Sequence, residues 1–322
     1  MLRSFLVLLL LLGGASRAVA QHIFESVGER ALGMAGAFVA VADDATAVYW
    51  NPAGLATGQP IGATIGWHRS RFGNPDDVPR PGPWAGDSTL STLGTWPLGV
   101  SFATLRTTAI AAAAGDTLQI ESLETRHFGV TILQTVWTGV VVGSTLKYVR
   151  GSAAIGPVEG LTVGEALDRG EDLERDASGA FDLDLGVMVD MVRVRAGVTI
   201  RNVREPSFGP DAETAITLPR QARMGVAVLP ADGLTLAIDA DLNTVDLRGD
   251  LRRMLAAGAE RRLGSRAAVR AGVRWDLEGP RDPVGSVGAS LALGRGMWLD
   301  GHYSQGRSGE DRQFGAALRA GS

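Results

Sequence analysis

The sequence predicts an all-β protein: a closed antiparallel transmembrane β-barrel of about 14 strands with a small N-terminal helical hatch. Three observations lead to this prediction. Apolar and polar residues alternate with a period of two from Ile61 onward. Long and short connections alternate along the chain, and the number of candidate strands is even, as in bacterial outer-membrane barrels.

The alternation is clearest in residues 180–190, AFDLDLGVMVD, where apolar residues alternate with Asp182, Asp184 and other residues. Because successive side chains of a strand point to opposite faces, this segment is a strand with one apolar and one charged face. Residues 192–202, VRVRAGVTIRN, repeat the pattern after a connection of about two residues, which is typical of a tight hairpin.

Alternation alone also fits a soluble β-sandwich with one wet face. We favour the membrane barrel because tight turns alternate with long connections such as 151–177, and because aromatic residues lie near both ends of the strands. Trp96, Trp137 and Trp298 lie near short turns, and Trp67, Tyr148, Trp275 and Tyr303 lie near long loops.

Charged residues recur in the middle of many strands, on the face that we expect to line the lumen. They either line a path for polar solutes or pair across strands and hold the hatch in place. We favour pairing, because paired charges cost less than lone ones away from bulk water. These residues are Asp182, Asp184, Arg193, Arg195, Asp239, Asp241, Arg270 and Arg274.

The N-terminus is typical of a secretory signal peptide. Arg3 precedes an apolar run over residues 5–12, and the run is followed by the small-residue sequence Ala-Val-Ala that ends at residue 20. The run is too short to cross a bilayer as a helix, although an uncleaved N-terminal anchor is the alternative. We therefore expect a signal peptide over 1–20, a hatch over 21–60 and a barrel over 61–322.

Composition argues against several other functions. The chain has no cysteine, which excludes disulfides, thiolate catalysis and thiolate metal sites. Its formal net charge of −4 offers nothing to attract nucleic acid. The four histidines are scattered and no HExxH or GxSxG motif occurs, so we expect no enzyme activity, no cofactor and no metal. An outer-membrane enzyme, the alternative, would need His127 or His302 beside a nucleophile.

Residues 31–56 do not alternate and precede the first strand. Asp43 or Asp44 can cap a short helix that runs to Trp50, and Pro52 disfavours helical geometry at Asn51. We interpret this stretch as a compact plug; a phosphate-binding loop is the alternative, but the GxGxxG spacing is missing. The residues expected to shape the hatch or touch a ligand are Phe38, Asp43, Asp44, Tyr49, Trp50, Asn51 and Pro52.

Residues 28–56, GERALGMAGAFVAVADDATAVYWNPAGLA, resemble the N-terminal signature of the FadL/TodX outer-membrane transport protein superfamily, and within it the PorV/PorQ-like branch. The resemblance rests on LGxxGA, an acidic pair followed by Ala, and Asn-Pro-Ala. It implies a fourteen-stranded barrel in the cell outer membrane with an N-terminal hatch inside. Fatty-acid transporters of this superfamily carry hydrophobic molecules by a hatch rearrangement and a lateral opening.

The resemblance thus implies transport of hydrophobic small molecules, similar to long-chain fatty acids, past the hatch. The expected partners are outer-membrane lipid and a hydrophobic ligand, with no nucleic acid. The alternative is a PorV-like protein that serves protein secretion or surface attachment, with secreted or envelope proteins as its partners.

Overall fold

The computed structural model describes residues 25–72, 83–112, 118–158, 162–169, 176–209, 215–247, 250–278, 283–307 and 311–321. The predicted signal peptide over 1–20, and the predicted start of the mature chain at Gln21, lie outside the described residues.

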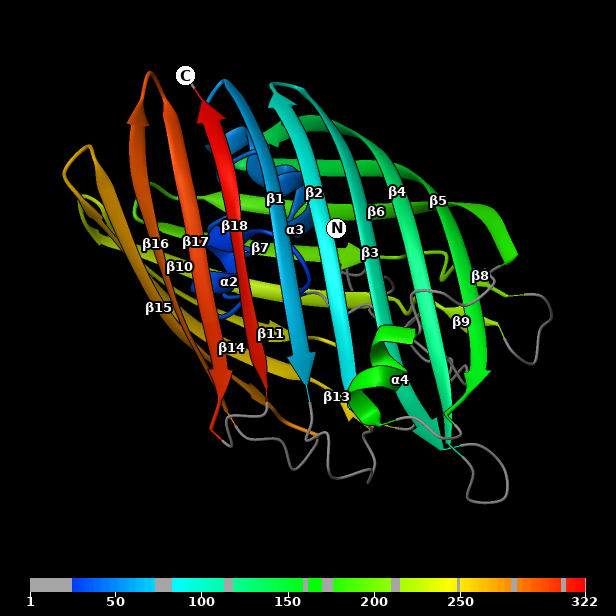
Figure 1. Ribbon diagram of the computed structural model, residues 1–322. Helices are drawn as coiled ribbons and strands as arrows, with labels where there is room; N and C mark the ends of the chain where they lie inside the picture. The colour runs from blue at the N-terminus through cyan, green and yellow to red at the C-terminus, as the bar shows by residue number, and fades with distance from the viewer. Residues whose placement is uncertain are drawn as a thin grey trace.

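In this part of the chain, fourteen antiparallel strands close into one barrel (Figure 1). Each strand pairs with its sequence neighbour in the barrel, and the first and last strands pair from Gly62–Gly321 to Arg71–Arg312. The closed all-β barrel that the sequence predicts is confirmed, and a two-sheet sandwich is excluded. The strands are β1 (Ile61–Phe72), β2 (Trp84–Thr95), β3 (Leu98–Ala112), β4 (Leu118–Trp137), β5 (Val140–Pro157), β6 (Asp176–Asp190), β7 (Val194–Arg201), β10 (Gln221–Ala231), β11 (Leu234–Asp241), β14 (Met254–Leu263), β15 (Ala267–Asp276), β16 (Val284–Gly294), β17 (Met297–Gly306) and β18 (Arg312–Gly321).

The remaining elements are short. They are α2 (Glu29–Gly33), α3 (Ala47–Trp50), the 3-10 helix η1 (Pro52–Thr57), α4 (Val163–Arg169), the hairpin of β8 (Ser207–Phe208) and β9 (Ile216–Thr217), and the hairpin of β12 (Val245–Leu247) and β13 (Asp250–Arg252). Figure 1 shows α2 and α3 inside the ring of strands. None of the helices in the described residues is long and apolar enough to cross a membrane.

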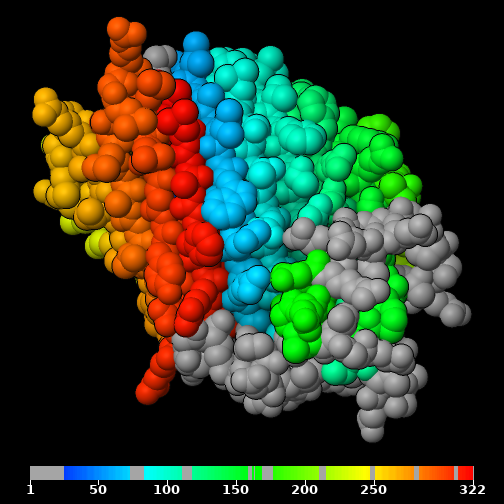
Figure 2. Space-filling view, viewed as in Figure 1, coloured from blue at the N-terminus to red at the C-terminus, as the bar shows by residue number. Residues whose placement is uncertain are grey.

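The two ends of the barrel differ. Tight turns such as Thr138-Gly139 join strands at one end, here called the turn end, and the long connections lie at the opposite loop end (Figure 1). On the face seen in Figure 2 the wall is continuous over β17, β18, β1 and β2.

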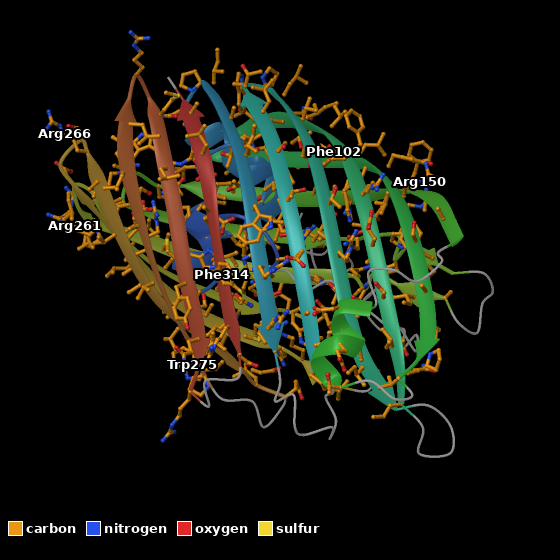
Figure 3. The ribbon with its side chains drawn as sticks, viewed as in Figure 1. Phe102, Arg150, Arg261, Arg266, Trp275 and Phe314 are labelled. Atoms are coloured by element: carbon orange, nitrogen blue, oxygen red, sulfur yellow. The ribbon has the colours of Figure 1, made fainter. Side chains whose placement is uncertain are left out.

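The outward face of the barrel is apolar. Side chains such as Ile65, Phe128 and Leu146 are more than half exposed, and the residues between them along each strand are buried and mostly polar or small. Figure 3 shows Phe102 and Phe314 pointing away from the lumen. This is the arrangement that a barrel needs when its outside meets hydrocarbon and its inside is polar.

One strand differs clearly from the sequence pattern. The alternation suggested a strand that begins near Thr125, but β4 begins at Leu118. Residues 120–125 are buried on both faces: Ile120 packs with Leu167 of α4, and Leu123 packs with Phe208 of β8. A strand covered on both sides loses the apolar–polar alternation, which is why the pattern failed there.

Candidate functional site

Residues 25–60, here called the N-terminal segment, pack inside the barrel. Residues 27–42 and 45–55 are buried throughout, and they form most of the largest hydrophobic core cluster. Helix α2 packs against β15 to β18, and η1 packs against β4 to β6 on the other side. The N-terminal segment therefore crosses the lumen from wall to wall.

Glycines in the barrel wall let this segment approach the strands closely. A Cβ atom on Gly143 would lie 2.4 Å from the Ala53 nitrogen, and one on Gly186 would lie 2.2 Å from Asn51 Oδ1. On the opposite wall, a Cβ on Gly258 would lie 2.6 Å from the Met34 carbonyl oxygen. Only glycine permits contacts this close, so the wall is shaped for this segment.

Asn51 links the N-terminal segment to itself and to the wall. Its side-chain amide donates hydrogen bonds to the carbonyl oxygens of Val39 (2.9 Å) and Val187 (3.1 Å), and its oxygen accepts one from the Ala53 N–H (3.2 Å). As the sequence suggests, α3 ends at Trp50, and Pro52 begins the next helical turn. Asp44 accepts a hydrogen bond from the Thr46 N–H (2.9 Å) just before α3.

A buried ion network surrounds Arg30 of α2. Its guanidinium contacts Asp43, Asp44 (3.0 Å) and Glu260 of β14 (2.7 Å), and Glu260 also contacts Arg270 (2.6 Å). Burial alone would lower the pKa of Arg30, but these carboxylates raise it well above its usual value. Burial would likewise raise the pKa of Asp44, but Arg30 and Arg319 hold it below its usual value.

A second set of contacts holds both ends of the stretch 25–39. Glu25 contacts Arg223 (2.6 Å) and Arg252 (3.0 Å). Burial opposes ionisation of Glu25, but Arg223 and Arg252 lower its pKa to about 2. Asp239 Oδ2 accepts hydrogen bonds from the backbone N–H groups of Phe38 (2.8 Å) and Val39 (2.7 Å).

The predicted lumen charges mostly pair with other charges. Asp182 and Asp184 both contact Lys147 (3.0 and 2.7 Å). Arg195 contacts Asp190 (3.1 Å) and Asp43 of the N-terminal segment (3.4 Å).

Asp241 contacts Arg223 (2.6 Å), and Arg270 contacts Glu260 (2.6 Å). Arg274 is the exception: it is buried, and among the described residues both terminal nitrogens of its guanidinium lack a hydrogen-bond partner.

One of the predicted lumen charges, Arg193, does not line the lumen. It lies exposed in the turn between β6 and β7, and its guanidinium donates to the Pro230 carbonyl oxygen (3.3 Å). Strand β7 begins at Val194, the residue after Arg193, so Arg193 lies in the turn and has no place on the inward face of the strand.

Three charged residues of these networks, Glu25, Arg30 and Glu260, were not predicted from the sequence. A usable signal was present for Arg30, because the pair Glu29-Arg30 interrupts an otherwise apolar and small-residue stretch. Such charges remain buried only when they have partners.

The expected ligand contacts of the hatch are not free surfaces in this structure. Phe38 is fully buried, packs edge-on against Trp50 with ring centroids 5.9 Å apart, and lies beneath the Arg30 guanidinium. The Arg201 guanidinium lies 3.4 Å above the Tyr49 ring centroid. Phe38 can therefore meet a ligand only if the N-terminal segment moves.

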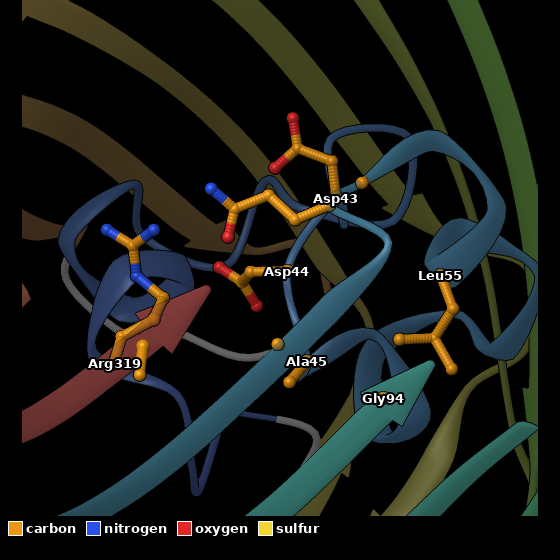
Figure 4. A pocket seen from close by; sticks show the side chains of 10 residues that line it. Asp43, Asp44, Ala45, Leu55, Gly94 and Arg319 are labelled. Carbon is orange, nitrogen blue, oxygen red and sulfur yellow. The ribbon is translucent and has the colours of Figure 1, made fainter. Parts of the chain in front are cut away.

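Cavities border the N-terminal segment. One of about 10 Å³, close to the space of a single water, is lined by residues that include Asp43, Asp44, Leu55 and Arg319 (Figure 4). A larger one of about 590 Å³ opens at the turn end, where Trp96 is among its lining residues.

At the loop end, an apolar cluster surrounds the β8–β9 hairpin. It comprises Leu123, Val149, Ala153, Phe208, Ile216 and Leu218.

Two of the histidines bear on the enzyme alternative. His127 lies 2.8 Å from the Thr125 hydroxyl on the same strand, and His302 Nδ1 lies 2.7 Å from Glu29 Oε2. The hydroxyl beside His127 meets one geometric requirement of nucleophilic catalysis. The structural neighbours described next are channels and transporters rather than enzymes.

Known proteins share this fold. The CymD monoaromatic hydrocarbon channel superposes with a TM-score of 0.61 and 15% identity over 93% of this chain and 98% of that chain. The Ralstonia pickettii toluene transporter TbuX superposes with a TM-score of 0.62 and 15% identity over 92% of this chain and 98% of that chain. A Pseudomonas aeruginosa FadL homologue superposes with a TM-score of 0.63 and 12% identity over 94% of this chain and 98% of that chain. At such identities the likeness shows the fold alone: that of FadL/TodX-type barrels.

Sequence comparison adds less. The family described as "F plasmid transfer operon, TraF, protein" matches residues 92–241, which is less than half of the chain. No curated protein matches the chain.

Proposed function

We propose that this chain, exported by its signal peptide, is an outer-membrane barrel that carries hydrophobic small molecules past the N-terminal segment, which acts as a hatch. The observation that carries the proposal is a separately packed segment lying across the lumen of a closed barrel with an apolar exterior. The shared fold with hydrocarbon channels supports the same conclusion. The exterior would contact outer-membrane lipid.

The ligand class follows from the surfaces that a molecule would meet. At the loop end the β8–β9 hairpin and the facing strands form an apolar cluster whose residues are at most 5% exposed, so an alkyl chain or a small aromatic ring can reach it only if the hairpin moves away from the strands. Further along the lumen, Phe38, Tyr49 and Trp50 are covered by the segment's own contacts. Transport then requires the hatch to shift, with Asp43, Asp44, Asn51 and Pro52 defining its docked shape.

A disulfide lock tests whether the hatch moves during transport. The chain has no native cysteine, and a Cβ on Gly62 of β1 would lie 3.7 Å from the Ala45 Cβ. That separation suits a disulfide, whose Cβ atoms lie about 3.5–4.5 Å apart. The double variant Ala45→Cys with Gly62→Cys therefore joins the hatch to the wall when it is oxidised.

We expect cells that carry the oxidised double variant to lose uptake of a fluorescent long-chain fatty acid and to regain it after reduction. Each single-cysteine variant, treated in the same way, is the matched control and should transport in both states. Equal uptake by the oxidised and reduced double variant would remove the hatch from the mechanism.

The alternative is a PorV-like protein that binds secreted or envelope proteins rather than transporting small molecules. The match of residues 92–241 to a family named for a plasmid transfer operon favours it, since that name refers to macromolecular transfer. Pull-down with the connections over 73–83 and 158–175 deleted, which leaves β1, β2, β5 and β6 whole, separates the two proposals. Lost partners with an intact barrel, and no fatty-acid uptake by the full chain, would favour the alternative.

A further inference from the structure

Three buried titratable side chains from distant parts of the sequence meet where α2 contacts the barrel wall. Glu29 comes from α2, His68 from β1 and His302 from β17. One potential ligand atom from each lies within 4.8 Å of the other two. The side chains of Glu29 and His302 are at most 1% exposed.

The strand register brings the two histidines together. His68 and His302 both pair with Gly315 of β18, which lies between them in the sheet. Because glycine has no side chain, the two imidazoles stack across it with centroids 5.2 Å apart and ring planes 20° apart.

The same glycine makes room for the carboxylate. A Cβ on Gly315 would lie 2.6 Å from Glu29 Oε2, and one on Gly66 of β1 would lie 3.3 Å from Glu29 Oε1. The wall therefore provides a space at this point that a polar group of α2 fills.

The nitrogen atoms of these rings have few partners. Among the described residues, both ring nitrogens of His68 and Nε2 of His302 are buried without a hydrogen-bond partner, and His302 Nδ1 faces only Glu29 Oε2. Buried polar groups are normally paired, so an unpaired imidazole in a dry site points to a missing ligand. A neutral imidazole offers a lone pair that can bind a metal ion.

We propose that Glu29, His68 and His302 bind a divalent transition-metal ion such as Zn²⁺, which links α2 to the wall strands β1 and β17. Two imidazole nitrogens and one carboxylate oxygen are a donor set that zinc accepts, with metal–ligand distances of about 2.0–2.2 Å. Tetrahedral geometry places such donors about 3.3 Å apart, so the three side chains need only small rotations to close around an ion.

Some of the charged groups around this site favour a bound cation and others disfavour it. Arg274 of β15 faces His68 and disfavours a cation, whereas Asp300 of β17 faces Glu29 and favours one. Asp300 is itself paired with Arg319 (2.9 Å), so these side charges roughly balance, and the Glu29 carboxylate is the negative charge that a bound dication would meet directly. The bound ion would hold the N-terminal segment against the seam where the first and last strands meet, whether or not the barrel transports anything.

The test is metal binding by the folded, mature protein in detergent after dialysis against a chelator. We expect calorimetric titration with ZnCl₂ to give one tight site per barrel, and Co²⁺ to give visible absorption bands that Zn²⁺ removes. His68→Ala and His302→Ala should each weaken Zn²⁺ binding by more than the roughly 10–100-fold that loss of an outer-shell partner costs. Gly315→Ala should also weaken it, because its methyl group would lie 2.5 Å from the Trp67 carbonyl oxygen and 2.6 Å from Glu29 Oε2 and would push β1 and Glu29 apart.

His127→Ala is the matched control, since His127 is another buried wall histidine outside the site; it should bind Zn²⁺ like the wild type. Heat-modifiable migration on gels verifies that each variant is folded. If the wild type binds neither ion, the proposal is wrong, and this result does not depend on any variant folding. Binding that survives in folded His68→Ala and His302→Ala would also overturn it.

Discussion

Asp239 provides the sharpest test of how the N-terminal segment is held. Its Oδ2 accepts the backbone N–H groups of Phe38 (2.8 Å) and Val39 (2.7 Å), and all three residues are buried. In Asp239→Ala both N–H groups lose their acceptor. Leaving a buried donor unpaired costs about 1–3 kcal/mol, so the docked state should lose about 2–6 kcal/mol. Each 1.4 kcal/mol is a factor of ten, so the undocked population should rise by about 30-fold to 10⁴-fold.

Hydrogen exchange measured by mass spectrometry on the detergent-solubilised barrel reads this population directly. Peptides that cover residues 36–42 should exchange faster in Asp239→Ala by that factor, while peptides from the wall strands keep their protection. Asp87→Ala is the control, because it removes a partly exposed ion pair with Arg69 that is worth about 0–1 kcal/mol. If residues 36–42 exchange at the wild-type rate in a folded Asp239→Ala barrel, this account of docking is wrong.

Three further predictions follow from the same contacts. In Gly186→Ala the new methyl group would lie 2.2 Å from Asn51 Oδ1, so the N-terminal segment should become sensitive to protease. The Glu25 carboxyl has a folded pKa of about 2, below its usual 4.5, so its stabilisation of the docked segment is present above pH 4.5 and is lost as the pH falls toward 2. Protection factors near the N-terminus, which correct for the slower intrinsic exchange of amides in acid, should therefore fall over that range. Leu146→Arg places a charge on the outward face in the middle of β5 and should lower the free energy of unfolding in lipid vesicles by about 2–4 kcal/mol. Leu263→Arg places the same charge near a turn and should lower it by only about 0–1 kcal/mol.

Each of these has its own control. Gly285→Ala, where a Cβ meets nothing closer than 3.9 Å, should leave protease sensitivity unchanged; equal sensitivity of both glycine variants would contradict the fitted wall. Glu25→Gln should remove the acid-induced change in exchange, and its persistence would assign the effect to other carboxylates. Equal vesicle folding of the two arginine variants would contradict a lipid-facing exterior.

The alternation of apolar and polar residues along the sequence was sufficient to predict most of the barrel strands. Side-chain direction along a strand depends only on residue number, so the period of two and the alternating connections predicted fourteen strands and their order. Helix α3 and its end before Pro52 also followed from nearby residues. The prediction failed where the environment was not local: β4 is covered on both faces at its start, and Arg193 lies just outside its strand.

The contacts inside the barrel required the tertiary structure. The histidines at 68 and 302 are far apart in the chain, and only closure of the sheet through β18 brings them to either side of Gly315. Likewise, Arg30 meets Glu260, and Asp239 meets Phe38, across more than 190 residues. Within each strand whose bounds it gave correctly, the sequence by itself determined which residues face inward, because side chains alternate between the two faces of a strand. Which inward residues meet was decided by barrel register and by the path of the N-terminal segment, because both depend on contacts between distant parts of the chain.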